Sequence, residues 1–79
     1  MSYTPAMQEF KNVVSRNLRK AIGNDPQTRA DIARSSGITE GHIRLLEKGE
    51  SHMSLWTAFR LSGAVGIGIN DLLEGYGDV

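Results

Sequence analysis

Charged and titratable side chains cluster between positions 39 and 49, in the stretch TEGHIRLLEKG, at Glu40, His42, Arg44 and Lys48. An arginine can form paired hydrogen bonds to guanine O6 and N7, whereas a glutamate can accept from cytosine N4. A lysine binds phosphate as a point charge. If the stretch is helical, steps of four place Glu40, Arg44 and Lys48 on one face. The residue types therefore favour recognition of a polar, charged partner by a helix surface.

Other chemistries find little support. The chain has no cysteine, and its two histidines, His42 and His52, have no further ligands at metal-binding spacing. It also lacks a nucleophile elbow and a pattern of paired carboxylates. We therefore expect no metal, no cofactor and no enzymatic activity.

The cluster is preceded by signals for two short helices separated by a turn. Thr28 and Asp31 form a potential capping box that starts the first helix. Gly37 is expected to end it in the left-handed conformation, which glycine adopts at little cost. Thr39 is then a suitable N-cap for the second helix. Two helices joined by a glycine-containing turn are a unit that can present its second helix to the DNA major groove.

Apolar spacing predicts which faces of the helices are buried. In the second helix Ile43 and Leu46 face the core, which leaves Glu40, Gly41, Arg44 and Lys48 on the other face. In the first, the residues expected to point inward are Ala30, Ile32 and Ala33. A preceding helix has its apolar stripe at Phe10, Val13, Val14, Leu18, Ala21 and Ile22 and ends near Gly23.

Two more helices are expected after the cluster. Ser54 caps a fourth helix, with Leu55, Ala58, Phe59, Leu61 and Val65 as its apolar residues, and Ile69, Leu72 and Leu73 suggest a short fifth one. The prediction is an all-α fold of five helices. Its domain covers residues 10–75, between a flexible N-terminal tail (1–9) and a C-terminal tail (76–79).

The 79 residues suffice for one domain with a small core, and their formal net charge is zero. The charge is unevenly distributed: residues 11–48 carry +4 and residues 49–79 carry −3. A positive face is thus compatible with overall neutrality. No stretch is apolar enough to span a membrane or to act as a signal peptide, so we expect a cytoplasmic protein.

The segment from Thr28 to Gly49 reads TRADIARSSGITEGHIRLLEKG and resembles the Cro/repressor-type helix-turn-helix family of phage repressors and bacterial transcriptional regulators. The family pattern is approximately T-Q-x-x-L-A-x-x-x-G-[VI]-[ST]-x-x-x-I-x-x-[IL]-E-x-G, and the chain matches it apart from Arg29 in place of the glutamine and Ile32 in place of the leucine. The similarity extends over about residues 14–74, with Met53 in place of a proline and Gly68 in place of a cap serine. It implies a five-helix, lambda-repressor-like DNA-binding domain.

The resemblance also implies residue roles. Arg29 replaces a glutamine that binds phosphate, and in several relatives the positions of Arg19 and Glu47 pair internally. The residues expected to bind DNA are Arg29, Thr39, Glu40, Gly41, His42, Arg44, Leu45, Lys48, Ser51 and His52. For His42, in the first turn of the second helix, a structural or phosphate-binding role is favoured over base reading. Among them Arg44 is the best candidate for reading a guanine, whereas simple solvation of Arg44 and Lys48 is the alternative. Leu45 suits either a thymine methyl or a protein partner.

One recognition helix makes few base contacts, so we expect a homodimer that binds a two-fold symmetric operator in double-stranded DNA. The candidate dimer surface is formed by Trp56, Leu72, Leu73 and Tyr76. Two other functions remain open. The scaffold could serve as a protein-interaction module without DNA binding, or as an antitoxin that binds a toxin and represses its own operon. A restriction-modification controller would have the same small dimeric form.

Overall fold

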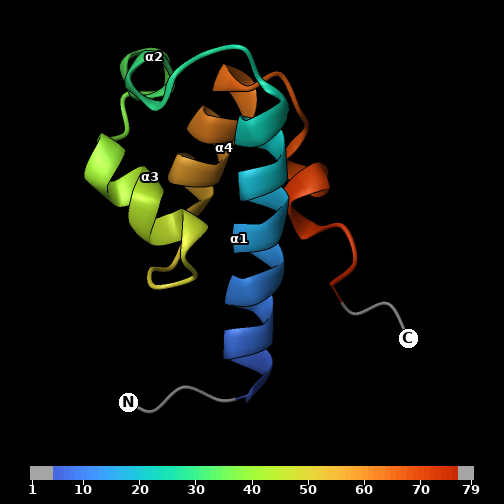
Figure 1. The fold of residues 1–79 in the computed structure, drawn as a ribbon. Helices are drawn as coiled ribbons and strands as arrows, with labels where there is room; N and C mark the ends of the chain where they lie inside the picture. The colour runs from blue at the N-terminus through green and yellow to red at the C-terminus, as the bar shows by residue number, and fades with distance from the viewer. Residues whose placement is uncertain (1–4, 77–79) are drawn as a thin grey trace.

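The computed structural model describes residues 5–76, which form an all-helical domain, as expected from the sequence. No strand occurs among these residues. Four α-helices precede a short 3-10 helix (Figure 1): α1 (Pro5–Asn24), α2 (Arg29–Ser36), α3 (Glu40–Glu47), α4 (Leu55–Ala64) and η1 (Ile69–Leu73). No helix in the described range is both long enough and apolar enough to cross a membrane.

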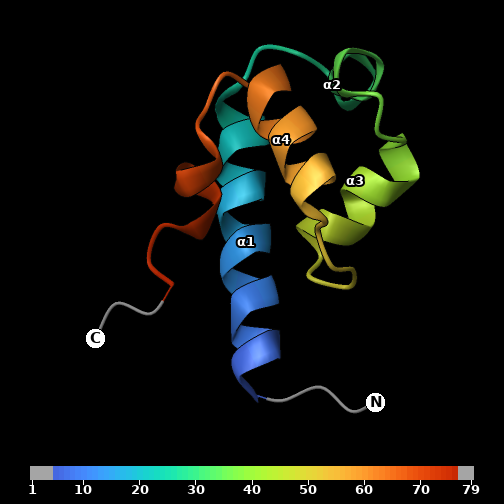
Figure 2. The ribbon, with the colours of Figure 1, turned by 180° about the vertical axis from the view of Figure 1, so that it is seen from behind.

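Helix α1 is the longest element and starts earlier than predicted. The sequence analysis placed residues 1–9 in a tail, but the helix begins at Pro5. Proline is well tolerated at the first helical position because its missing N–H would have no intrahelical acceptor there. Residues 1–4 of the predicted tail lie outside the described range. Helix α1 packs against both α3 and η1, which lie on opposite sides of it in both views (Figures 1 and 2).

The α2–turn–α3 unit forms by the local signals predicted from the sequence. Thr28 and Asp31 form the reciprocal capping box, and Gly37 ends α2 with φ +78°. The Thr39 hydroxyl then accepts a hydrogen bond from the backbone N–H of His42 and caps α3. Ala30, which was expected to point inward, is exposed. Only Ile32 and Ser36 of α2 are fully buried, so this short helix contributes a narrow stripe to the core.

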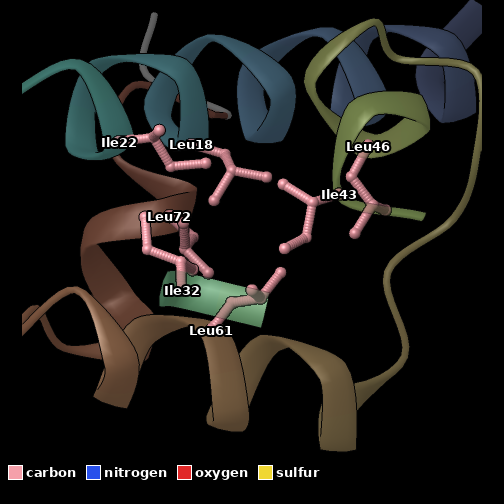
Figure 3. Close-up of a cluster of buried hydrophobic side chains, with 7 residues drawn as sticks. All are labelled: Leu18, Ile22, Ile32, Ile43, Leu46, Leu61 and Leu72. Atoms are coloured by element: carbon pink, nitrogen blue, oxygen red, sulfur yellow. The ribbon is translucent and has the colours of Figure 1, made fainter. Parts of the chain in front are cut away.

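One apolar cluster holds the five elements together (Figure 3). Every element contributes to it, through Leu18, Ile22, Ile32, Ile43, Leu46, Leu61 and Leu72. Burying side chains of this size stabilises a fold by about 1.5–3 kcal/mol each. Helix α3 is thus held in place by the same cluster that holds α1 and α4, and its orientation depends on the whole fold.

The exposed face of α4 differs from the prediction. Of the apolar residues predicted for this helix, Leu61 is buried as expected, but Leu55 and Phe59 are exposed. At about 100° per residue, Leu55, Trp56 and Phe59 occupy one arc of the helix. Ala58 and Leu61 lie on the opposite arc. The helical spacing of these residues would have separated the two arcs, but the prediction grouped all apolar residues of the helix together.

The C-terminal segment is anchored to α1. The Asn17 side chain donates hydrogen bonds to the carbonyl oxygens of Leu72 (2.8 Å) and Glu74 (3.0 Å). Tyr76, which was assigned to the C-terminal tail, packs edge-on against Phe10 with 5.2 Å between ring centroids. The remainder of that tail, residues 77–79, lies outside the described range. The fifth helix is present, but as a 3-10 helix.

Candidate nucleic-acid interface

Helix α3 is half buried along its length. Ile43 and Leu46 are in the core, and Glu47 beside them is also buried. The opposite face of α3 is open to solvent at Gly41, Arg44, Leu45 and Lys48. This arrangement matches the face predicted from spacing. We call the solvent-exposed set Thr39, Gly41, Arg44, Leu45 and Lys48 the α3 outer face.

The two cations of the α3 outer face, Arg44 and Lys48, have no side-chain partner in the described part of the chain. Neither Arg44 nor Lys48 forms an ion pair or a side-chain hydrogen bond with any residue in the range 5–76. Their eight N–H donors are therefore satisfied by water. Such cations can exchange water for phosphate oxygens or base edges without breaking an internal interaction.

The other members of the α3 outer face are small or apolar. A Cβ added to Gly41 would meet no atom within 4 Å, so the backbone there is accessible from outside. Leu45 is 43% exposed, although leucine is commonly buried. Thr39 is exposed while its hydroxyl serves as the α3 cap. A surface with two cations, an open backbone and one methyl-rich side chain suits the edge of a DNA groove.

Glu40 and His42 differ from the residues of the α3 outer face because both are half-buried. The Nε2 atom of His42 is covered and has no hydrogen-bond partner among residues 5–76. The ring therefore cannot present that nitrogen to an external group without moving. We accordingly assign His42 to packing at the margin of the α3 outer face, which is the structural one of the two roles favoured for it from the sequence.

Glu47 is the centre of an internal ion pair. Its carboxylate accepts from Arg29 Nε (2.8 Å) and Nη2 (2.7 Å), a paired geometry that fixes both side chains. Arg19 donates to the backbone carbonyl oxygen of Glu47 at 2.6 Å. The expected structural role of Glu47 agrees with this geometry. The partner of its carboxylate, however, is Arg29, whereas the resemblance implied Arg19.

This ion pair changes the interpretation of Arg29, which was expected to bind phosphate. The side-chain hydrogen bond to Glu47 raises the pKa of the Arg29 guanidinium, and the charge of Glu47 acts in the same direction. The charge of Glu40 adds a smaller effect of the same sign. Arg29 therefore positions α3 against α2, and the N–H groups that do not bind Glu47, two on Nη1 and one on Nη2, remain for an outside ligand.

The loop after α3 lies beside the α3 outer face. Gly49 adopts φ +72° and packs on α1, where an added Cβ would lie 3.4 Å from Asn12 Oδ1. Ser51 is half-buried and His52 is exposed. Both are thus near the end of α3 that carries Lys48, as expected for residues that contact a DNA backbone.

The predicted dimer surface is only partly exposed. Leu72 was proposed as an interface residue but is 2% exposed and belongs to the core, so this prediction is wrong. Leu73 and Tyr76 are each 38% exposed, and Trp56 is 64% exposed. The sequence analysis missed Leu55 and Phe59, which lie beside Trp56 on the surface of α4. Their shared helical arc was the signal that could have identified them.

Residues 5–76 contain no cluster of three or more histidine, cysteine, aspartate or glutamate side chains able to hold a metal ion. Comparisons with protein-family profiles, curated proteins and solved structures found no match for this chain. Arguments about function therefore depend on the geometry described above.

Proposed function

We propose that the protein is a sequence-specific, double-stranded DNA-binding transcriptional regulator with a lambda-repressor-like helix-turn-helix domain. In this proposal α3 enters the major groove, and two copies bind a two-fold symmetric operator. Arg44 reads a base, and Lys48 contacts phosphate together with Ser51 and His52.

One observation carries the proposal. A short helix docked through Ile43 and Leu46 leaves Arg44 and Lys48 on its outer side, without partners among residues 5–76. Arginine and lysine side chains that lack a structural role within the domain, on a helix narrow enough for a major groove about 12 Å wide, suit DNA recognition. The net positive charge of residues 11–48, which include α3, also supports DNA binding by this part of the chain, since the excess of acidic residues lies after residue 48.

The ion pair between Arg29 and Glu47 supports the proposal indirectly. Base recognition requires side chains held by a rigid support, because small displacements weaken paired hydrogen bonds. Arg29 and Arg19 connect the last turn of α3 to α2 and α1, respectively. The recognition helix is thereby fixed at Glu47, between Arg44 and Lys48.

Selection of bound sequences from random double-stranded DNA tests the proposal. The expected result is an enriched consensus with two-fold symmetry and half-sites centred about one DNA turn, or 10 base pairs, apart. Affinity for the selected sequence should fall as salt is added, because each neutralised phosphate releases counterions. A variant that lacks both cations, Arg44→Ala with Lys48→Ala, serves as the matched control. An absence of enrichment above this control would contradict the proposal.

A second candidate is a protein-interaction module, including an antitoxin that also binds DNA. The exposed Leu55, Trp56 and Phe59 favour it, since large apolar side chains gathered at a surface mark contact sites. The selection of bound DNA sequences described above also distinguishes these candidate functions. A pure interaction module would enrich no sequence, whereas an antitoxin that represses its own operon would still enrich one.

A further inference from the structure

The most apolar part of the described surface lies along α4 and η1. Leu55, Trp56 and Phe59 are 76%, 64% and 57% exposed, and half-buried Ile69 completes a hollow with them. A second apolar groove adjoins it, sharing Leu55 and Ile69 and extending to Leu73. We call this continuous set Leu55, Trp56, Phe59, Ile69 and Leu73 the α4 face.

We propose that the α4 face is the surface through which two copies of this chain form a symmetric dimer. The inference depends on the proposed function, because a two-fold operator requires two copies. It also corrects the dimer surface predicted from the sequence. The centre moves from the C-terminal segment to Leu55, Trp56 and Phe59, and Leu72 is excluded.

The exposed area fits a second copy. From their exposed fractions, Leu55, Trp56 and Phe59 together present on the order of 400 Å² of apolar surface. A standard interface covers about 800 Å² per partner, of which roughly 60% is apolar. The three side chains, with Ile69 and Leu73 at the edge, therefore supply about the apolar area that one half of a stable dimer needs.

The charge of the α4 face also fits a second copy. None of its five side chains is charged, so bringing two identical faces together does not oppose like charges. The nearest cation, Arg60, has its guanidinium 5.3 Å from the centroid of the Trp56 ring. It also donates to the carbonyl oxygens of Ser36 (2.8 Å) and Ser35 (3.4 Å). Arg60 is thus held within its own domain and does not select an acidic partner.

The position of the α4 face leaves α3 free. Helix α3 and η1 lie on opposite sides of α1 (Figures 1 and 2), and α4 borders η1. None of the five residues of the α4 face belongs to α3, so a second copy docked on this face does not have to cover the α3 outer face. Half-sites one DNA turn apart need each α3 about 17 Å from the axis. The domain measures 34 × 27 × 19 Å, so that distance lies within one copy.

Sedimentation of the full chain over a dilution series, without DNA, tests the proposal. The wild-type protein should dimerise, and Trp56→Glu should raise the dimer dissociation constant by about tenfold or more, as expected for an aromatic residue at an interface centre. The substitution should not disturb folding, since Trp56 is exposed and the new carboxylate lies four residues before Arg60. Circular dichroism confirms folding.

Two variants serve as controls. Leu45→Glu introduces the same charge at an exposed residue outside the α4 face, on α3, and should leave the dimer dissociation constant unchanged. Tyr76→Ala tests the C-terminal surface predicted from the sequence and should have little effect. A dimer that survives Trp56→Glu, or one lost in Tyr76→Ala alone, would overturn the assignment.

The fluorescence of wild-type Trp56, the chain's single tryptophan, provides a measurement that needs no variant. Its emission should shift to shorter wavelength as the protein is concentrated and the indole becomes buried. A monomer at high micromolar concentration with unshifted emission would overturn the proposal and leave the α4 face to another protein or peptide. Selection of bound DNA sequences tests the proposed function separately from the dimer. If the protein is monomeric but still enriches a single half-site, DNA binding is supported and only the dimer proposal is overturned.

Discussion

Arg44 and Lys48 carry the same charge on adjacent turns of α3, but they differ in what they can recognise. The planar guanidinium can form two parallel hydrogen bonds to guanine, whereas the ammonium of lysine contacts phosphate as a point charge. Glu47 lies between them and faces inward to Arg29. Three charged side chains within five residues thus have three roles, which are set by the direction in which each one points.

Substituting these two cations separately should have different effects. Arg44→Ala is expected to cost about 1–3 kcal/mol on the selected DNA and to relax the preference at one position of each half-site. Lys48→Ala should weaken binding to all sequences alike and reduce the salt slope by about one. Titrations on the selected sequence and on single-base variants measure both effects. A uniform loss in Arg44→Ala would show that Arg44 contacts phosphate.

Asp31 gives the stability of α2 a dependence on pH. Hydrogen bonds from the backbone and hydroxyl of Thr28 lower the pKa of its carboxyl below the ordinary value, and Arg34 adds to the effect. Ionised Asp31 therefore stabilises the folded state above the unfolded-state pKa, near pH 4. This contribution is lost as the pH falls through the folded-state pKa.

The variant Asp31→Asn tests this dependence. The difference in free energy of unfolding between wild type and variant should be largest at neutral pH and should shrink in acid. Urea unfolding at several pH values measures it. A difference that stays constant with pH would show that the charge of Asp31 contributes nothing to stability.

At the scale of the elements, two glycines of the α2–α3 unit differ in their expected effect on stability: Gly37 favours the fold and Gly41 weakens α3. Gly37 needs its left-handed conformation to end α2, whereas Gly41 has a helical backbone inside α3. An added Cβ meets nothing within 4 Å at either position, so steric crowding is the same for both. Only the backbone conformation distinguishes them.

Gly37→Ala should therefore destabilise the protein by about 1–2 kcal/mol, the cost of a left-handed residue with a Cβ. Gly41→Ala should stabilise it by about 0.5–1 kcal/mol, since alanine is the better helix former. Urea unfolding measures both changes. If the backbone of Gly41 closely approaches DNA, Gly41→Ala should bind more weakly although it is more stable. Unchanged affinity would exclude that role.

The sequence predicted best those features that depend on neighbouring residues. Thr28, Gly37 and Thr39 determine where α2 ends and α3 begins through hydrogen bonds within four residues, and these predictions are confirmed. Burial along α4 was predicted less well, because it depends on how the helix docks against α2 and η1. Leu55 and Phe59 were misassigned for that reason.

In the candidate site, too, features that depend on local sequence were predicted better than features that depend on how the helices pack. The outer side of α3 follows from helical periodicity, and Arg44 and Lys48 are exposed as predicted. The partner of Glu47 could not be derived, since Arg19 and Arg29 both reach it and only the packing of α1, α2 and α3 determines that Arg29 binds the carboxylate. His42 was likewise assigned without knowledge of what covers its Nε2 atom.

At the scale of the whole molecule, Leu72 and Leu73 are expected to have different roles: Leu72 in the folding of the domain and Leu73 in the proposed dimer. They are adjacent in η1, yet Leu72 is 2% exposed and Leu73 38%. Leu72 joins the cluster to which every other element contributes. A domain of 79 residues has few such side chains, so each has a large share in its stability.

Leu72→Ala should lower the free energy of unfolding by about 2–5 kcal/mol, as expected for a buried leucine. Leu73→Ala should cost less than about 1 kcal/mol and act mainly on dimerisation, through the edge of the α4 face. Urea unfolding at one fixed protein concentration compares the two variants. Equal losses of stability would contradict the assignment of Leu72 to the core and Leu73 to the surface.

The most direct measurement for the central claim is the change in backbone amide NMR signals as duplex DNA is added. The outer side of α3 is expected to form the DNA contact, so the largest changes should fall on Thr39, Gly41, Arg44, Leu45 and Lys48, and then on Ser51 and His52. The amides of Leu55, Trp56 and Phe59 should change little. Changes centred on α4 and η1 would contradict the account. An absence of changes at a large molar excess of the selected DNA would contradict it as well.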